Sequence, residues 1–430
     1  MGKSTETENY YDVIILGGGA AGITAAISTK RHHPQLSVLI VDQTFALGRK
    51  ILVSGAGRCN ITNGNLAKDD WRKRYYCDTP QLLDSVFAQF GYNEIIAYFE
   101  DLGIKLYEEQ KNNNGKIFPI TDSAKNVVAL LIDELQRLGV VISIESSCTK
   151  VTKSNSLFQL QINKENRHRL FTSKYLICAT GGKTYPALGS DGSGYDLIKD
   201  LGHAILSPVP AAGPLISKDR ICHELQGVKT NVSASLIIDG KIQKSGIDDL
   251  LFTQYGVSGS LIFNFSRHVS TKFNRGESGT KIFVVVDFLP TITRLELSKY
   301  LQKQWDKRPG QTVVNSLLGI LNAKIASVLC RQGGINPVKQ VKDINQDVQK
   351  AIIEKIKAYK IEIVGTKGWN ESEFTAGGVR AAEINPKTLA SYLVQGLYLC
   401  GEVINVDGDV GGFNLSWAWA SGYLAGKLIE

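Results

Sequence analysis

The sequence lacks closely spaced pairs of cysteines. Its seven cysteines are dispersed, at positions 59, 77, 148, 178, 222, 330 and 400, and no two of them form a C-x-x-C motif. An odd and scattered set argues against a disulfide framework and a structural zinc site, and it predicts a reducing, cytoplasmic environment. It also argues against enzymes that relay electrons through two neighbouring cysteines.

Long apolar runs and metal-ligand patterns are missing as well. The most apolar early stretch, Val13 to Ile27, is interrupted by four glycines and is too short to span a bilayer. Met1 to Tyr10 has no apolar core of the kind found in signal peptides. The six histidines show no metal-ligand spacing. We therefore expect neither a membrane association nor a metal site.

Excess charge of one sign is small, with a formal net charge of +8 over 430 residues. One basic cluster is interleaved with aromatic residues, W-R-K-R-Y-Y from Trp71 to Tyr76. Such a mixture suits nucleic acid, but most charge runs are solvated surface segments, and we favour that interpretation. Nucleic acid is not the expected partner and is kept as an alternative.

Glycine, in contrast, is abundant and clustered, and its first cluster predicts a dinucleotide site. An apolar run from Tyr11 to Leu16 leads into G-G-G-A-A-G at Gly17 to Gly22, a helical stretch follows to about Lys30, and a second apolar run from Leu36 ends on Asp42. In a strand–turn–helix–strand unit, such glycines permit the tight turn, the close approach of a pyrophosphate and close helix packing. The acid then accepts hydrogen bonds from a ribose, and the helix N-terminus faces the phosphates.

A second glycine-rich, cationic loop favours FAD over NAD(P). It reads G-R-K-I-L-V-S-G-A-G-R-C-N-I-T-N from Gly48 to Asn63. FAD is longer than NAD, and its ribityl chain and isoalloxazine ring need further backbone to hold them.

This loop resembles the G-R-K-x-x-x-S-G-x-G-R-C-N-x-T-N signature of the BaiN-like flavoproteins, also called the aminoacetone-oxidase-like family. Further segments agree: the strand ending in A-T-G-G at Ala179 to Gly182, the strand closing on Gly401-Glu402, and G-G-F-N at Gly411 to Asn414 before a helix from Leu415 to Leu428. The resemblance implies that Glu402 reaches the ribityl hydroxyls and that the last helix start faces the flavin pyrimidine edge, where it stabilises negative charge on reduced flavin. It also puts the backbone near Cys148 beside the adenine.

The cofactor-binding residues expected from the motifs and the resemblance together are Gly17, Gly19, Ala20, Ala21, Gly22, Asp42, Gln43, Gly48, Arg49, Lys50, Gly57, Arg58, Cys59, Asn60, Cys148, Ala179, Thr180, Gly181, Gly182, Gly401, Glu402, Gly411, Gly412, Phe413, Asn414 and Leu415. Two residues are weak catalytic candidates, Cys59 as a redox-reactive thiol and Tyr185 as a proton donor; a small wall residue and a packed tyrosine are the simpler interpretations.

Two segments depart from the family pattern. Asn405 stands where G-E-x-L-D would place an acid, and Gln254 replaces the histidine of L-F-T-H-x-G-x-S-G. Glutamine can orient a substrate but cannot act as an acid or base at neutral pH.

The pattern predicts an α/β fold with a discontinuous Rossmann-type FAD domain, of the two-dinucleotide-binding-domain flavoprotein type, at 1–203 and 361–430. A β-rich, barrel-like insertion is expected at 204–291 and a helical insertion at 292–360, with helices at Glu296 to Asp306, Thr312 to Leu321 and Val348 to Tyr359.

The expected function is FAD-dependent hydride transfer to or from a small organic substrate. The resemblance suggests amino-ketone oxidation by oxygen or NAD(P)H-dependent reduction of an unsaturated compound. Because the chain has one dinucleotide motif, any NAD(P)H would bind transiently. One alternative is a flavin-dependent protein that modifies or binds tRNA, which the positive charge supports. The other is a fumarate-reductase-like dehydrogenase, but we identify no arginine that could serve as its general acid.

Overall fold

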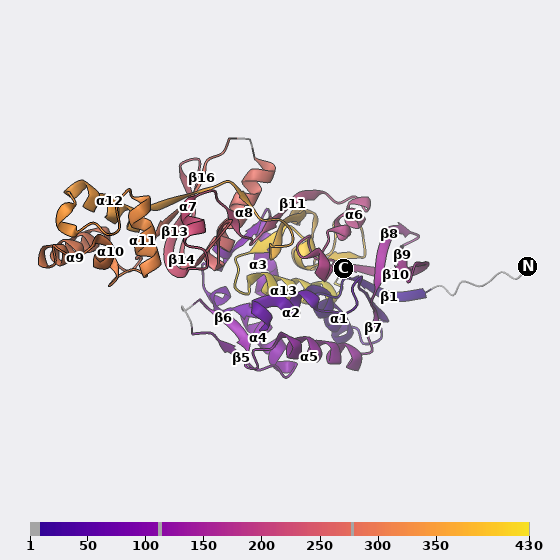
Figure 1. Ribbon diagram of the computed structural model, residues 1–430. Helices are drawn as coiled ribbons and strands as arrows, with labels where there is room; N and C mark the ends of the chain where they lie inside the picture. Colours follow the sequence, from indigo (N-terminus) through magenta and orange to yellow (C-terminus); the bar gives the residue numbers. More distant parts are fainter. Residues whose placement is uncertain (1–8, 111–113, 277–278, 430) are drawn as a thin grey trace, which may run out of the picture. The chain divides into compact units, whose positions relative to one another are not determined.

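The computed structural model describes residues 9–110, 114–276 and 279–429 (Figure 1). Within them the chain forms two compact units. Unit 1 runs up to Pro210 and resumes at Ser372, and unit 2 is Ala211–Glu371. The chain thus leaves unit 1 once and returns to it. The finer division predicted at 203, 291 and 360 stays a prediction.

Unit 1 is built on a mixed sheet with strand order β7-β2-β1-β10-β9-β8, and β20 pairs with the end of β10. Strands β7, β2, β1, β10 and β20 are parallel, whereas β9 and β8 are antiparallel to their neighbours. The bounds are β1 Asn9–Leu16, β2 Val38–Val41, β7 Val141–Ser143, β8 Ser146–Ser154, β9 Leu157–Lys164, β10 Arg167–Cys178 and β20 Leu397–Leu399. The apolar runs in β1 and β2 are fully buried, as parallel strands covered on both faces require.

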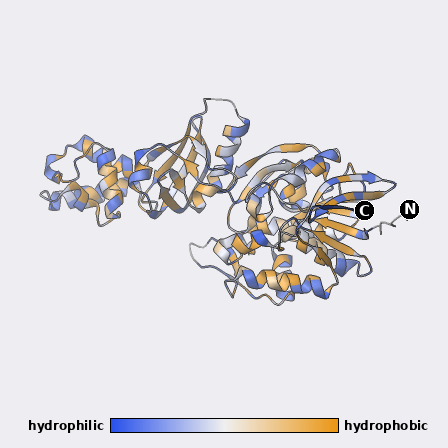
Figure 2. Ribbon diagram, turned by 45° about the vertical axis from the view of Figure 1, so that its right-hand side comes forward, coloured by the Kyte–Doolittle hydropathy of each residue, from blue (hydrophilic) through white to orange (hydrophobic). Residues whose placement is uncertain are grey.

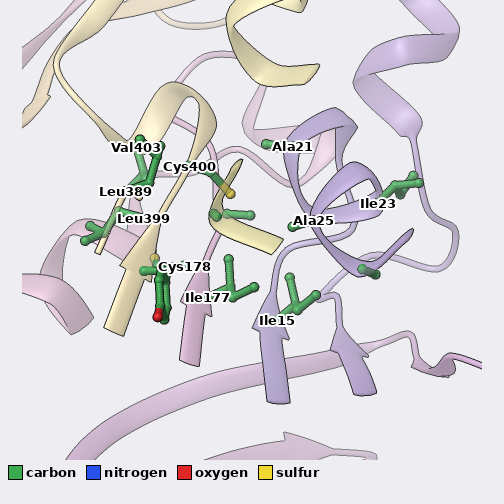
Figure 3. Packing of buried hydrophobic residues seen from close by; sticks show 14 of the residues in the cluster. Ile15, Ala21, Ile23, Ala25, Ile177, Cys178, Leu389, Leu399, Cys400 and Val403 are labelled. Atoms are coloured by element: carbon green, nitrogen blue, oxygen red, sulfur yellow. The ribbon is translucent and has the colours of Figure 1, made fainter. Parts of the chain in front are cut away.

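The last helix of the chain, α13 (Phe413–Gly426), packs directly on the first helix, α1 (Ala20–His32), beside this sheet. A Cβ atom added at Gly422 of α13 would lie 2.3 Å from the carbonyl oxygen of Ala21 in α1. One added at Gly426 would lie 2.3 Å from that of Ala25. Figure 3 shows the buried side chains of the sheet beside α1. Small residues on both helices therefore allow backbone contact, which explains why residues near the C-terminus belong to the N-terminal fold.

The rest of unit 1 consists of short elements around this sheet. They are α2 Arg49–Val53, η1 Ser54–Gly57, β3 Thr62–Asn63, η2 Gly64–Ala67, η3 Trp71–Arg74, β4 Tyr75–Cys77, α3 Pro80–Gln89, α4 Tyr92–Asp101, β5 Leu106–Glu108, β6 Lys116–Pro119, α5 Ala124–Arg137, η5 Pro186–Leu188, α6 Ser193–Asp200, β11 Ile205–Ala211, β19 Phe374–Val379, η7 Ala381–Glu383, η8 Gly401–Val403 and β21 Val406–Gly408.

Unit 2 combines an antiparallel sheet, order β17-β16-β13-β14-β15-β12-β18, with helices. The strands are β12 Leu215–Ile216, β13 Lys229–Ile238, β14 Lys241–Thr253, β15 Gly256–Ser258, β16 Ile282–Asp287, β17 Tyr359–Ile363 and β18 Gly365–Thr366. The helices are α7 Arg220–Glu224, α8 Ser260–Arg275, α9 Arg294–Lys307, α10 Val313–Leu317, α11 Ala323–Gln332, η6 Val341–Asp343 and α12 Gln346–Lys357. One hydrophobic cluster joins sheet and helices. Figure 2 shows hydrophilic and hydrophobic residues side by side along the helices α9 to α12, and the cluster includes hydrophobic residues of these helices.

Within the described ranges, no helix combines the length and apolarity needed to cross a membrane.

Candidate functional site

The glycine turn joins β1 to α1 and lies against the end of β10. Gly17 has φ 99°, and a Cβ atom there would lie 2.3 Å from the carbonyl oxygen of Ala179. A Cβ at Gly22 would lie 1.9 Å from the carbonyl oxygen of Gly17, whereas one at Gly19 would have no atom within 4 Å. Gly17 and Gly22 are therefore required by the protein's own packing, and Gly19 leaves open space at the start of α1. No side chain caps that helix start, so its first N–H groups suit a phosphate.

Asp42 ends β2 and organises the neighbouring loops. Its carboxylate accepts the N–H of Gly18 at 2.7 Å and the N–H and hydroxyl of Thr44 at 2.8 and 2.6 Å. These three hydrogen bonds hold the Asp42 carboxylate in place beside the glycine turn. The next side chain, Gln43, donates to the carbonyl oxygen of Gly189 at 2.9 Å.

A single cleft in unit 1 brings together many of the residues predicted from separate motifs. Its walls come from the glycine turn, the end of β2, the start of α2, the start of β8 and the end of β10. The predicted residues that line it are Gly17, Gly19, Asp42, Gln43, Gly48, Arg49, Lys50, Cys148, Ala179, Thr180 and Gly181. An elongated ligand with a phosphate near the helix start fits this arrangement.

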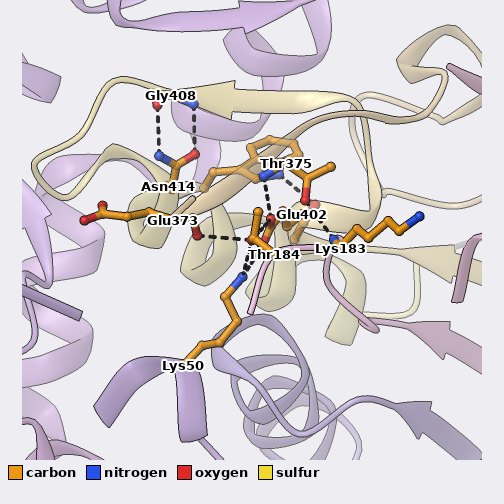
Figure 4. Close-up of polar contacts among 10 residues, drawn as sticks. Lys50, Lys183, Thr184, Glu373, Thr375, Glu402, Gly408 and Asn414 are labelled. Atoms are coloured by element: carbon orange, nitrogen blue, oxygen red, sulfur yellow. Dashed lines mark hydrogen bonds and ion pairs between the residues drawn. The ribbon is translucent and has the colours of Figure 1, made fainter. Parts of the chain in front are cut away.

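A polar cluster around Glu402 borders the Lys50 end of this cleft (Figure 4). One carboxylate oxygen accepts the N–H of Thr375 at 2.8 Å and the hydroxyl of Thr184 at 3.3 Å. The other is 2.8 Å from the amine of Lys50. A Cβ at Gly182 would lie 2.5 Å from the Glu402 carboxylate, so the second glycine of A-T-G-G makes room for this acid.

The start of α13 is fastened to the second glycine-rich loop. Gly412 has φ 104°, and a Cβ there would lie 2.4 Å from the carbonyl oxygen of Thr62. The side-chain amide of Asn414 accepts the N–H of Gly408 and donates to the carbonyl oxygen of Gly408, each at 2.9 Å. Asn63 donates to the carbonyl oxygen of Gly411 at 2.7 Å. Two motifs about 350 residues apart in sequence therefore form one rigid wall.

This wall contains an unsatisfied acceptor. The Oδ1 atom of Asn60 is buried and has no hydrogen-bond partner among the described residues. It would lie 3.1 Å from a Cβ added at Gly412. Buried acceptors are almost always paired, so a ligand N–H is the natural partner here. The pyrimidine edge of a flavin presents such an N–H. The orphaned acceptor, together with the open space at Gly19, fits FAD.

Two predicted loop residues are engaged by the protein instead. The guanidinium of Arg58 lies 3.0 Å from Glu109 and 3.9 Å above the ring of Phe118. Cys59 is fully buried with φ 63°, and burial raises the pKa of its thiol to about 12. The thiol is therefore protonated at neutral pH, which favours the interpretation of Cys59 as a wall residue. The other weak candidate, Tyr185, is half-buried with φ 56° directly before η5.

We expect Cys59→Ala to keep the rate of flavin reduction within about threefold of the wild-type rate, because a buried neutral thiol is a poor nucleophile. Alanine has the same Cβ, so the left-handed backbone gains no new strain. Stopped-flow bleaching of the flavin band measures the rate. A loss of a hundredfold or more with normal FAD content would assign Cys59 to the chemistry.

Several polar residues of this region were missed by motif reading. Thr184, Thr375, Lys116 and Glu373 are separated in sequence, and the Thr184 hydroxyl joins two of the segments by donating to the carbonyl oxygen of Glu373 at 3.2 Å. Water reaches the Glu373 side chain, yet the surrounding protein limits its hydration. This desolvation raises the pKa of the Glu373 carboxyl, against the opposing positive charges of Lys116 and Lys50. Thr184 follows A-T-G-G by two residues and could have been included on that ground.

The basic cluster at Trp71 to Tyr76 is largely neutralised. Arg72 pairs with Asp84, Lys73 lies 3.9 Å from Asp70, and Arg74 lies 3.6 Å from Asp409. In the described residues, each of its three cations thus has an acidic neighbour. Among all the residues that the structure describes, no group of three or more His, Cys, Asp and Glu residues could hold a metal ion.

Comparison with known proteins identifies the family of the chain. A family model described as "HI0933-like protein Rossmann domain" matches residues 11–428. The chain is 34% identical over 413 residues to the 3-dehydro-bile acid delta(4,6)-reductase of Clostridium scindens, covering 96% of this chain and 97% of that protein. It is 30% identical over 413 residues to the ribosomal RNA dihydrouridine synthase of Escherichia coli K12, covering 96% of each.

Solved structures show the same fold. The 3-ketosteroid-delta4-(5alpha)-dehydrogenase of Rhodococcus jostii RHA1 aligns with a TM-score of 0.50 at 14% identity, covering 100% of this chain and 99% of that one. The flavoprotein family and the mixed α/β, Rossmann-like fold expected from the motifs are confirmed. The chain belongs to the HI0933-like family of Rossmann-fold, FAD-binding oxidoreductases.

Proposed function

We propose that this protein reduces a carbon–carbon double bond conjugated to a carbonyl group, with NAD(P)H as the transient hydride donor. The support is a chemistry shared by the two relatives. A 3-dehydro Δ4,6 steroid is a dienone, and the uracil ring of uridine also carries its C5–C6 double bond next to a carbonyl. In both, hydride adds to an electron-poor carbon of the conjugated system, which is the β-carbon in uracil and the β- or δ-carbon in the dienone, and a proton adds to the other carbon of the reduced double bond. The two names therefore describe one reaction type on two substrates.

The residues of unit 1 suit this reaction. We assign the pyrophosphate to Gly17, Gly19 and the first turn of α1, the adenosine ribose to Asp42, and the ribityl chain to Glu402 and Lys50. The pyrimidine edge of the flavin falls to Asn60 and the start of α13. When bound, FAD supplies hydride transfer at N5. The observation that carries this placement of the flavin is the orphaned Asn60 acceptor beside Gly412.

The proton requires an acid that is protonated near the working pH. Glu373 is accessible to a ligand, and its raised pKa makes it a better donor than an ordinary surface carboxyl. The nearby positive charge of Lys116 would stabilise negative charge that develops on the substrate carbonyl oxygen. We therefore assign Glu373 as the proton donor. We assign both the β-rich and the helical segment of unit 2 to substrate recognition. The β-rich segment is proposed to be a barrel-like insertion.

An anaerobic titration with NADH and NADPH tests the proposal through the flavin absorbance near ~450 nm. We expect one nicotinamide to bleach the band within the dead time of manual mixing, and a cyclic dienone to restore it. A flavin that ignores both nicotinamides but is bleached by an amino-ketone would instead make the protein an oxidase.

A uracil ring within RNA is the second candidate substrate, and the distribution of charge favours it. Residues 292–360 contain thirteen Lys and Arg but five Asp and Glu, a net charge of +8. This equals the formal net charge of the whole chain, so the remaining residues are neutral overall.

A further inference from the structure

We propose that the helical segment 292–360 carries an RNA-docking surface formed by Lys299, Lys303, Lys307, Arg308, Lys339 and Lys342, called the lysine face below. This inference rests on the proposed function with a uracil ring of RNA as the substrate, and the lysine face is the surface that would hold that RNA.

The first step is the placement of three lysines on α9. Lys299, Lys303 and Lys307 are spaced by four residues and therefore form one row, with about 6 Å of helical rise between neighbours. The buried row of the same helix, Leu297, Leu301 and Trp305, is offset by two residues and lies on the opposite side. All three lysines are exposed. They border a shallow surface hollow together with Gln302 and Asp306.

The second step is the chain segment that extends this row. The N–H of Lys342 donates to the carbonyl oxygen of Pro309 at 2.9 Å, and the carbonyl oxygen of Lys339 accepts from Val313 at 2.9 Å. The segment at 339–342 thus runs beside the residues that follow α9. It places Lys342 beside Pro309, next to Arg308, and Lys339 beside Val313, so we group the row and this segment as one surface.

The third step is that no ion pair is found for these cations among the described residues, even though Asp306 borders the same hollow as the lysines of α9. Three other cations of the same segment have acidic partners: Arg294 with Glu354, Arg331 with Glu224, and Lys357 with Asp287. None of the six cations of the lysine face forms an ion pair within the part of the chain that the structure describes. Such a group of like charges attracts a polyanion, whose phosphates can neutralise it.

The chemistry of this surface points to phosphates rather than to lipid or protein. A basic helix that binds membranes inserts a continuous apolar face, but the apolar row of α9 is buried, with Leu297 and Leu301 0% exposed and Trp305 3% exposed, and Leu295 is an isolated exposed leucine on this helix. Protein interfaces are depleted of lysine and enriched in arginine and aromatic residues at their centre. A lysine-rich surface with a neighbouring exposed tyrosine, Tyr300, matches contacts to a nucleic-acid backbone.

The test is fluorescence anisotropy of the FAD-loaded, full-length protein with a labelled RNA hairpin carrying uridines in its loop. K299E/K303E/K307E should raise Kd at least tenfold and reduce the slope of log K against log salt by about two to three. The matched control K105E/K125E/K241E changes the charge equally at three exposed lysines elsewhere and should alter Kd less than threefold.

Equal losses in both triple variants, or no loss in the first, would overturn the inference. Binding to vesicles of anionic phospholipid without binding to the hairpin would overturn it in favour of a membrane. The NAD(P)H titration of the same samples separates the two proposals. RNA binding with an unreactive flavin would leave the surface standing and remove the proposed reaction. A reactive flavin without RNA binding would leave only the small-molecule substrate.

Discussion

Replacing Gly19 by Ala is expected to give a folded protein that retains little FAD, whereas replacing Gly22 by Ala is expected to damage folding itself. The two glycines are three residues apart in one motif but face different neighbours. A Cβ at Gly22 would lie 1.9 Å from a backbone carbonyl oxygen of the turn, which cannot move without breaking it. A Cβ at Gly19 would meet no protein atom within 4 Å, and the backbone there, φ −83° and ψ −167°, suits any residue.

The expected magnitudes follow from this geometry. Gly22→Ala should lower the free energy of unfolding by about 1–3 kcal/mol, the usual effect of overpacking, and the melting temperature by several degrees. Gly19→Ala should change the stability of the apoprotein by less than about 0.5 kcal/mol, as surface changes do. Its FAD dissociation constant should rise about 10- to 100-fold, because the methyl group occupies the space assigned to the pyrophosphate.

Calorimetry of both apoproteins and FAD titration of the refolded samples give these values. Gly103→Ala is not a suitable control because that glycine has φ 78°. Gly310→Ala is suitable, since its Cβ would meet nothing and its backbone lies outside the left-handed region. Normal FAD affinity in Gly19→Ala would move the pyrophosphate away from the start of α1.

Local patterns predicted the nucleotide motif well because its parts are consecutive. The expected strand Tyr11 to Leu16 lies within β1, and the helix expected to about Lys30 ends at His32. The last helix, expected at Leu415 to Leu428, is observed at Phe413–Gly426. Apolar runs and glycine spacing report on contacts within such a unit, and those contacts decide its structure.

Patterns failed where a short polar signal separates two helices. One helix was expected from Thr312 to Leu321, but α10 ends at Leu317 and a separate helix, α11, begins at Ala323. The expected helix therefore ends four residues too late, and α11, which Asn322 caps by accepting the N–H of Lys324, was not predicted. Capping by a single asparagine is a local signal that hydrophobic spacing alone does not show.

The polar centre of the site was the least predictable part. Thr375 and Glu373 return to the neighbourhood of Thr184 after about 190 residues, through β19. No motif marks them, because their roles arise from this return and not from their neighbours in sequence. Glu402 was identified only because a recurrent strand ending precedes it.

Glu373→Gln is expected to lower steady-state turnover of a conjugated enone about 10²- to 10⁴-fold, the usual contribution of a positioned acid. FAD content and the rate of flavin reduction by NAD(P)H should stay unchanged, because those steps need no proton from this carboxyl. Glu371→Gln, an exposed acid two residues earlier, is the matched control and should behave like the wild type.

The pH dependence gives a readout that a structural role would not produce. Desolvation raises the pKa of Glu373, so the protonated form persists to a higher pH than in an ordinary glutamate. Wild-type turnover should fall as pH rises through that pKa, because the donor loses its proton. In Glu373→Gln this limb should be absent, since glutamine does not titrate. If the variant keeps the same alkaline limb at reduced rate, the proton comes from another group, and Tyr185 becomes the residue to test.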